Sequence, residues 1–175
     1  LIKKFLYSDQ EIFLRELISN ATDALTKMQH LSSIGEFKGE IGDLGVELKI
    51  DKKAKKLHII DNGVGMTSDE VKKYINDVAF SGAEEFLEKY KETSKDTGII
   101  GHFGLGFYSS FMVSDKVEII TKSYKDESAA HWICDGSPEY SLKKSEKSER
   151  GTEIILHISK DSKDYLEESK ISELL

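Results

Sequence analysis

EIFLRELISNATDALTKM, residues 11–28, decides the fold of this 175-residue chain because it predicts a long helix with three different faces. At about 100° per residue, its apolar side chains gather on one broad arc that belongs in a core. A stripe of four polar residues lies beside that arc. An ordinary surface helix needs only a buried face and a solvent-exposed face, so this third stripe indicates the wall of a polar site. The alternative is a set of i,i+4 pairs, each stabilising the helix by about 0.2–0.5 kcal/mol. The arc contains Phe13, Leu14, Leu17, Ile18, Ala21, Leu25 and Met28, and the stripe contains Glu16, Asn20, Asp23 and Lys27.

The composition favours one compact domain and narrows its partners. A hydrophobic fraction of 38% supports a core at this length. The formal net charge of −7 argues against a broad phosphate-binding surface, and so against nucleic acid as a partner, but it leaves a local nucleotide site open. The single cysteine, Cys134, cannot form an internal disulfide, and no apolar run approaches the roughly 20 residues that cross a bilayer. We therefore expect a cytoplasmic domain with no membrane contact.

The rest of the chain alternates between short strands, helices and turns. Connections of hairpin length at 124–129, 135–139 and 145–151 indicate antiparallel neighbours. The pattern predicts an α+β two-layer sandwich, in which a mixed, mostly antiparallel sheet carries helices on one face. We expect strands at 46–50, 57–61, 117–121, 130–134, 140–143 and 152–158, a helix from Thr67 to about Ala79 with a Thr67–Glu70 capping box, a short helix at 107–113 and a closing helix at 164–175.

The sequence DNGVGM at residues 61–66 places an acid directly after a predicted strand and just before a predicted helix. Its glycines permit positive φ and let a ligand lie against the main chain. Asp61 is able to accept a hydrogen bond from an amine. The stretch is not a Rossmann fingerprint, because Ser68 stands at the third glycine position. The alternative interpretation is an ordinary strand-to-helix turn with a solvated aspartate.

A second glycine cluster, GIIGHFGLGF at residues 98–107, also leads into a predicted helix. Main-chain N–H groups ahead of a helix N-terminus converge on anions, so the cluster predicts a phosphate-binding loop. It lacks the Lys-Ser or Lys-Thr of a Walker loop, and Lys27 is a candidate for the missing cation. The alternative is a flexible hinge. Together with the charged segment before it, the cluster predicts a mobile lid over about residues 80–106.

The later strands and the histidines add three smaller predictions. RGT at residues 150–152 opens the last strand, and Thr152 would place its hydroxyl beside Asp61 if their two strands are neighbours. The alternative is a β-branched residue that suits a strand. The five histidines have no metal-ligand spacing, so we assign no transition-metal site. Trp132 fits best in the core.

Four segments together resemble, in order and spacing, the ATP-binding N-terminal domain of the ninety-kilodalton heat-shock chaperone family. They are EIFLRELISNATDAL, DNGVGM, GHFGLGFYSSFMV and RGTEIILHISKD. The stretch DGSPEYSL and the short loops are similar to the bacterial type. The family has the Bergerat, or GHKL, ATPase fold, which it shares with type II topoisomerases, mismatch-repair ATPases and sensor histidine kinases. The resemblance implies that residues 1–175 form an N-terminal nucleotide-binding domain.

The resemblance also implies a role for each matching position. Glu16 matches the general base that activates water, and Asn20 matches the side chain that holds Mg²⁺. A glutamate can accept a proton without binding the metal, and Mg²⁺ needs few protein ligands. Asp61 matches the carboxylate that receives the adenine amine, with Gly65 and Thr152 at the same end. The other matching positions are the apolar walls Ala24, Met66, Ile75 and Phe107, the polar groups Asp23 and Lys27 near the mouth, and the lid edge Gly101, Gly104, Leu105 and Gly106.

The implied function is that of a Mg²⁺-dependent ATPase domain of a molecular chaperone, with ATP or ADP and Mg²⁺ as cofactors. The full-length protein would handle unfolded client proteins as a homodimer, whereas we expect the isolated domain to be monomeric. It should bind nucleotide well and hydrolyse it poorly, because the family's first strand, middle domain and dimer domain would lie outside this chain. Three alternatives stay open: a sensor histidine kinase-like domain, a non-hydrolysing adenine-nucleotide sensor and the ATPase module of a DNA-processing enzyme. Phosphohistidine formation would favour the first, and the net charge of −7 weighs against the last.

Overall fold

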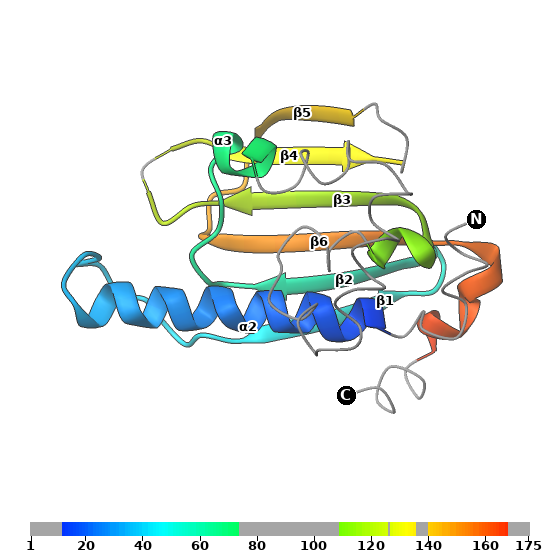
Figure 1. The fold of residues 1–175 in the computed structure, drawn as a ribbon, viewed down its shortest axis with the longest axis horizontal. Coiled ribbons are helices and arrows are strands. Elements are labelled where there is room, and N and C mark those ends of the chain that lie inside the picture. Colours follow the sequence, from blue (N-terminus) through cyan, green and yellow to red (C-terminus); the bar gives the residue numbers. More distant parts are fainter. Residues whose placement is uncertain (1–11, 74–108, 126, 136–139, 168–175) are drawn as a thin grey trace, which may run out of the picture.

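The computed structural model describes residues 12–73, 109–125, 127–135 and 140–167. Figure 1 shows a long helix beside a sheet, with shorter helical segments near the sheet's ends. The segments labelled η are 3₁₀-helices. In chain order the elements are α2 (Ile12–Ser33), β1 (Val46–Asp51), β2 (Lys56–Asp61), α3 (Ser68–Val71), η3 (Ser109–Met112), β3 (Ser114–Lys122), β4 (Ala129–Cys134), β5 (Tyr140–Ser145), β6 (Gly151–Ile158) and η4 (Lys160–Leu166).

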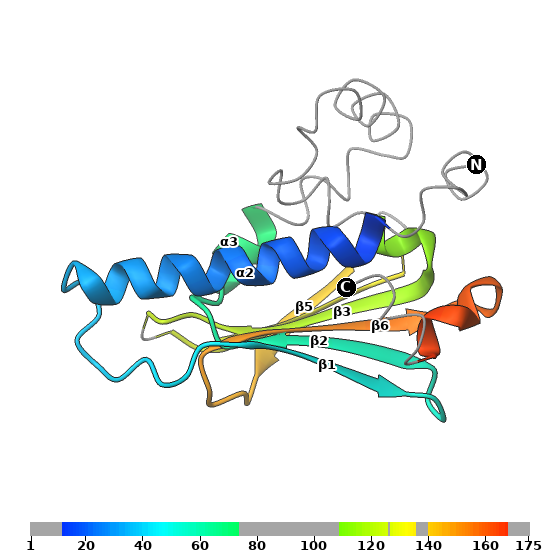
Figure 2. The ribbon, with the colours of Figure 1, turned by 90° about the horizontal axis from the view of Figure 1, so that it is seen from below.

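Helix α2 lies across one face of the sheet, as Figure 2 shows. Five of the seven residues in its predicted apolar arc are buried, and Phe13, Leu17 and Met28 are each 0% exposed. The other two, Ile18 and Leu25, are partly buried. The ring of Phe13 meets that of Tyr165 edge-on, with centroids 4.9 Å apart. Burying each such side chain contributes about 1.5–3 kcal/mol. The predicted helix is confirmed, and it continues past residue 28 to Ser33.

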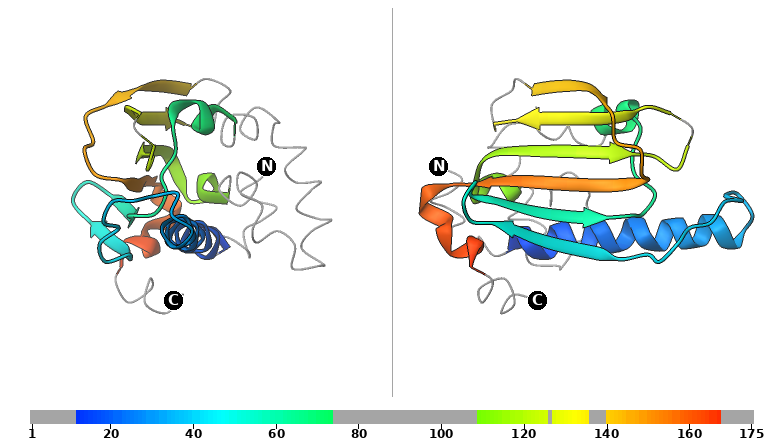
Figure 3. Two further views of the ribbon diagram at one scale, coloured as in Figure 1. Left: turned by 90° about the vertical axis from the view of Figure 1, so that its left-hand side faces the viewer. Right: turned by 180° about the vertical axis from the view of Figure 1, so that it is seen from behind.

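The six strands form one sheet in the order β1-β2-β6-β3-β4-β5. Their five pairings are all antiparallel, so the described strands contain no parallel pair. Figure 3 shows this sheet from one end and from the side opposite α2. The predicted two-layer α+β architecture is confirmed.

The place of β6 differs from the sequence-based expectation. β6 lies between β2 and β3, so the connection at 145–151 is not the hairpin that its length indicated. Six of the eight residues of β6 are buried, which is typical of a strand with neighbours on both sides. No residue of β5 is fully buried, and β5 forms an edge. The chain therefore passes β4 and β3 and places β6, with six buried residues, at the centre of the sheet.

The shorter helices agree with the sequence in part. The capping box of α3 is confirmed, because Thr67 Oγ1 accepts from Glu70 N at 3.2 Å and Glu70 Oε1 accepts from Thr67 N at 2.9 Å. The rest of that predicted helix, to residue 79, lies outside the described residues. The short helix expected at 107–113 is described only as the 3₁₀-helix η3.

The closing α-helix expected from residue 164 is wrong in its described part. Residues 160–166 form 3₁₀ turns with a kink at Ser162, and Glu167 has an extended conformation. Within these turns the consecutive residues Tyr165 and Leu166 are both buried in the core. Within the described ranges, no helix is long and apolar enough to cross a membrane.

Directly opposed residues form rows across the sheet on the face that α2 covers. One row is apolar and runs through Ile59, Ile154, Ile119, Trp132 and Leu142. Trp132 is 0% exposed, as predicted. Two residues further along each strand, the same face carries a polar row. This second row brings together residues from three strands that are distant in the sequence.

Candidate functional site

Glu16 is a buried acid near the N-terminal end of α2. It is 1% exposed, and neither of its carboxylate oxygens has a hydrogen-bond partner among the described residues. Burial raises the pKa of Glu16 from 4.5 to about 7, and the positive charge of Arg15 opposes this only in part. A carboxyl group with a pKa near 7 can accept and release a proton at neutral pH, which is the requirement for a general base.

Asn20 lies one helical turn beyond Glu16 and on the same side of α2. Its Nδ2 is buried, also without a partner in the described part of the chain. A buried donor without an acceptor costs about 1–3 kcal/mol, so such a group needs an explanation, and a ligand is one. The first half of the polar stripe therefore agrees with the polar-site interpretation.

The second half of the stripe agrees with the alternative interpretation. Asp23 and Lys27 are 65% and 68% exposed at their side chains, and Lys27 Nζ lies 3.9 Å from Asp23 Oδ2. An exposed pair of this kind stabilises a protein by about 0–1 kcal/mol. The stripe thus changes from buried and unpaired to solvated and paired along its length.

Asp61 ends β2 and belongs to the polar row of the sheet. It is 6% exposed, and its Oδ1 accepts a hydrogen bond from Gly63 N at 2.9 Å. Burial raises the pKa of Asp61 from 3.8 to about 6, against the opposing effects of the Gly63 N–H, the charge of Lys147 and the Thr152 N–H. The solvated-turn alternative is therefore wrong. Thr152 stands directly opposite Asp61, which confirms that their strands are neighbours.

Thr121 is a buried member of the same row that the sequence analysis missed. It stands opposite Thr152, is 0% exposed, and its Oγ1 lies 2.8 Å from Thr152 Oγ1. The same oxygen accepts from Met66 N at 2.9 Å and lies 3.2 Å from the carbonyl oxygen of Gly151. The signal was a polar residue at an inward position of an otherwise apolar alternation, after Val117 and Ile119.

The glycines of the 61–66 loop serve packing within the protein. Gly65 has a φ of +65°, and a Cβ there would collide with the carbonyl oxygen of Lys122. A Cβ on Gly63 would clash with the main chain of Ala24 in α2. Val64 N donates to Ala24 O at 3.2 Å. The loop is therefore held between α2 and β3 by close approaches of the protein's own backbone.

Arg150 fixes the main chain that follows Asp61, a role that the sequence did not indicate. Its Nε donates to the carbonyl oxygens of Asn62 and Gly63, each at 3.1 Å. Its Nη2 donates to Asn62 O at 2.9 Å and to Ile41 O at 2.8 Å. These acceptors are main-chain atoms, so no side-chain partner in the sequence could reveal the contact.

On the face opposite α2, histidines pair with glutamates. Glu118 accepts from His131 Nε2 at 2.8 Å and from His157 Nε2 at 2.5 Å. Burial raises the pKa of Glu118, but the hydrogen bonds from His157 and His131 outweigh it and hold that pKa below 4.5. His58 Nδ1 lies 2.7 Å from Glu153 Oε2. Within the described ranges, no cluster of three His, Cys, Asp or Glu residues is arranged to hold a metal ion.

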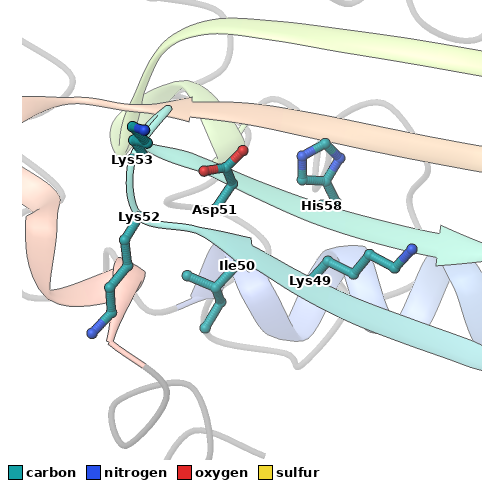
Figure 4. A pocket seen from close by; sticks show the side chains of 6 residues that line it. All are labelled: Lys49, Ile50, Asp51, Lys52, Lys53 and His58. Atoms are coloured by element: carbon teal, nitrogen blue, oxygen red, sulfur yellow. The ribbon is translucent and has the colours of Figure 1, made fainter.

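A hollow of about 630 Å³ lies at the β1–β2 hairpin and contains none of the predicted site residues. In Figure 4 its lysines point in different directions, and it lies at the end of β2 opposite Asp61. It is not the candidate site. Its lining residues are Lys49, Ile50, Asp51, Lys52, Lys53 and His58.

Part of the predicted site lies outside the described residues. This applies to the whole predicted lid, residues 80–106. It also applies to the predicted nucleotide contacts Ile75, Gly101, Gly104, Leu105, Gly106 and Phe107. The described part of the site is therefore formed by α2 and by the ends of β2, β6 and β3.

These features define a class of protein. A long helix with a buried acid lies on an antiparallel sheet whose three central strands carry an acid and two hydroxyls in one row near the same end of the sheet. This is the Bergerat-type ATPase arrangement that the sequence resemblance implied. The family of histidine kinase-, DNA gyrase B- and HSP90-like ATPases matches residues 7–164, and the chain belongs to this family.

The chain is similar to bacterial proteins that are chaperones by name and to an endoplasmin homolog. The chain is 59% identical to the chaperone protein HtpG of Bacteroides thetaiotaomicron over 176 residues, which cover 100% of this chain and 25% of that protein. It is 57% identical to HtpG of Porphyromonas gingivalis, covering 99% of this chain and 25% of the relative. Identity to the endoplasmin homolog of Dictyostelium discoideum is 44%, over 97% of this chain and 23% of that protein. The chain spans about a quarter of these relatives, and its recognition as HSP90-like is confirmed.

Proposed function

We propose that residues 1–175 are the N-terminal ATP-binding and ATP-hydrolysing domain of a molecular chaperone. Family membership and the names of the relatives support this proposal. The observation that carries it is Glu16, a buried acid with no partner in the described part of the chain and a pKa of about 7. A structural acid at that position would be paired, because an unpaired buried carboxylate is strongly destabilising.

Mg²⁺ is the metal that the family implies, and the residues present fit it. The amide of Asn20 has a buried nitrogen without a partner, so the side chain is not committed to a protein contact in the described residues. Its Oδ1 is the kind of oxygen that Mg²⁺ takes as one of few protein ligands. When bound, Mg²⁺ would neutralise charge on the phosphates of ATP or ADP. Asn20 would hold it in place.

Glu16 is proposed as the group that accepts a proton from the attacking water. One helical turn separates it from Asn20, so it can act beside the phosphates without being a metal ligand. With a pKa of about 7, a large fraction of Glu16 is ionised at neutral pH and ready to take up that proton. A sensor kinase transfers phosphate to a histidine and has no need for this water-activating acid. Glu16 therefore favours hydrolysis.

Asp61 and Thr152 are proposed to receive the adenine end of the nucleotide. Both are buried in the polar row, and their oxygens are suited to the amine donors of adenine. We propose Gly65 at this end, apolar walls from Ala24, Met66, Ile75 and Phe107, polar groups from Asp23 and Lys27 at the mouth, and phosphate contacts from Gly101, Gly104, Leu105 and Gly106.

The activity of the whole protein follows as a proposal from the relatives' names. We propose that the full-length chaperone is a cytoplasmic homodimer that handles unfolded client proteins. The isolated domain would be a monomer with weak turnover. The relatives are about four times as long as this chain, so client-binding surfaces would lie in the other parts.

The test separates binding from chemistry. Glu16→Gln keeps the shape of the side chain but removes the proton acceptor. Mg-ATP affinity measured by calorimetry should stay within a few-fold, while turnover by the full-length protein should fall by about 10²–10⁴-fold. Glu47→Gln, an exposed glutamate on β1, is the matched control and should keep both values. Turnover at the unmodified rate in Glu16→Gln would show that Glu16 is not the group that accepts the proton.

A further inference from the structure

The polar row on the helix-covered face joins three side chains in direct register. Asp61 of β2 stands opposite Thr152 of β6, and Thr152 stands opposite Thr121 of β3. Their exposed fractions are 6%, 7% and 0%. The neighbouring row is wholly apolar, so three adjacent polar side chains are an interruption of the core pattern. Buried polar groups cost free energy unless they are hydrogen-bonded, so the contacts of these side chains decide what the row can do.

The contacts of Thr121 determine where the hydroxyl protons lie. Thr121 Oγ1 accepts from Met66 N, which can only donate. It also lies 3.2 Å from the carbonyl oxygen of Gly151, which can only accept, so the single proton of Thr121 goes to that oxygen. The remaining contact, 2.8 Å to Thr152 Oγ1, is then satisfied only if Thr152 donates. This arrangement makes all three hydrogen bonds at once, whereas the reverse direction gives up the bond to Gly151.

The consequence for Thr152 is that its only proton points toward Thr121. Its oxygen has only acceptor capacity left for a ligand. Asp61 likewise offers only acceptors when it is ionised. The described side chains at this end of the site therefore present acceptors and no donor.

We propose that Thr121 is a positioning residue for purine selectivity, which directs the Thr152 hydroxyl so that the site accepts a 6-amino purine and rejects a 6-oxo purine. This inference rests on the proposed adenine-nucleotide function. The amine of adenine carries two N–H donors, whereas the corresponding group of guanine or hypoxanthine is a carbonyl acceptor. A 6-oxo group would face lone pairs of Asp61 and Thr152. A Thr152 hydroxyl free to rotate would instead donate to that carbonyl and weaken the discrimination.

The test compares ATP with inosine triphosphate, which carries a 6-oxo group, by measuring both dissociation constants for this chain by calorimetry. Thr121→Val removes the acceptor that holds the Thr152 proton. The dissociation constant for inosine triphosphate divided by that for ATP measures the selectivity. In Thr121→Val this ratio should fall about tenfold, as expected for the loss of about 1.4 kcal/mol of discrimination. Thr121→Ser keeps the hydroxyl and should restore the ratio to within about threefold of the unmodified chain.

A purely structural role for Thr121 predicts a different result. Thr121→Val would then weaken ATP and inosine triphosphate by the same factor, and an unchanged ratio overturns the proposal. Should Thr121→Val fail to fold, Thr152→Val removes the directed hydroxyl itself and must lower the ratio in the same way. An unchanged ratio in Thr152→Val also overturns the inference, while ATP binding in the unmodified chain leaves the proposed function standing. Failure of the unmodified chain to bind ATP would overturn both.

Discussion

Asp61→Asn should weaken nucleotide binding and stabilise the ligand-free fold at the same time. The carboxylate is 6% exposed, and burial raises its pKa from 3.8 to about 6. At about 1.36 kcal/mol for each pKa unit, the ionised group destabilises the folded state by about 3 kcal/mol at neutral pH. An amide has no charge to bury, and its oxygen can still accept from Gly63 N. The gain should stay below about 3 kcal/mol, because the new NH₂ group also needs acceptors.

The pH dependence tests the cause of this effect. The folded-state pKa of Asp61 is raised, so its destabilising effect is nearly complete above about pH 6. It decreases as the pH falls toward 3.8 and disappears below 3.8, where both states are protonated. Urea unfolding at pH 7 and at pH 4 should therefore show a larger difference between Asp61→Asn and the unmodified chain at pH 7. Asp115→Asn, an exposed aspartate on β3, is the control and should change little at either pH.

Asp61→Asn should also lower the affinity for ATP, because it replaces a charged hydrogen-bond acceptor with a neutral amide. A hydrogen bond to a charged group contributes about 1.5–3 kcal/mol, so ATP affinity should fall by about tenfold to a hundredfold. Calorimetry at pH 7 measures this directly. Equal ATP affinity in Asp61→Asn and the unmodified chain would refute the adenine role. A stability difference that is the same at both pH values would refute burial of the charge as its cause.

Two further predictions concern stability. Gly65→Ala should lower the free energy of unfolding by at least about 1–2 kcal/mol, because its φ of +65° is unfavourable for alanine and the added Cβ collides with backbone. Urea unfolding should show little change in Gly45→Ala, where no atom lies within 4 Å of the new Cβ. Glu118→Gln should destabilise the protein by about 1–2 kcal/mol at pH 7, because the carboxylate accepts from both His131 and His157. The folded-state pKa of Glu118 lies below 4.5, so this contribution is present above pH 4.5 and lost as the pH falls; a loss that is equal at pH 7 and pH 3 would contradict the reasoning.

Periodicity and turn chemistry predicted the local elements because both are local properties. The buried arc of α2, the β1–β2 hairpin and the capping box at Thr67 all depend on residues within a few positions of one another. The polar stripe of α2 was harder to interpret. Glu16 and Asp23 have the same chemistry and spacing signal, yet one is 1% exposed and the other has a side chain 65% exposed. Only the packing of the helix against the sheet separates the two cases.

Contacts between distant segments were not predictable in the same way. A connection of hairpin length at 145–151 gave no sign that β6 inserts between β2 and β3. That insertion creates the row of Asp61, Thr152 and Thr121, so the role of Thr121 could not be found before the strand order. Arg150 was missed for a related reason, because it binds carbonyl oxygens, and every residue carries one.

The two buried acids differ in one respect that matters for their roles. Asp61 has main-chain N–H groups of Gly63 and Thr152 near its carboxylate, and these favour the charged form. Glu16 has no such donor among the described residues, and its pKa is about 7, compared with about 6 for Asp61. At pH 7 Asp61 is therefore mostly ionised and acts as a lasting acceptor, whereas Glu16 is close to the midpoint of its titration. Environments that separate the pKa values of two carboxyl groups also separate their functions. On this reasoning Asp61 is suited to recognition of an amine, and Glu16 to the transfer of a proton.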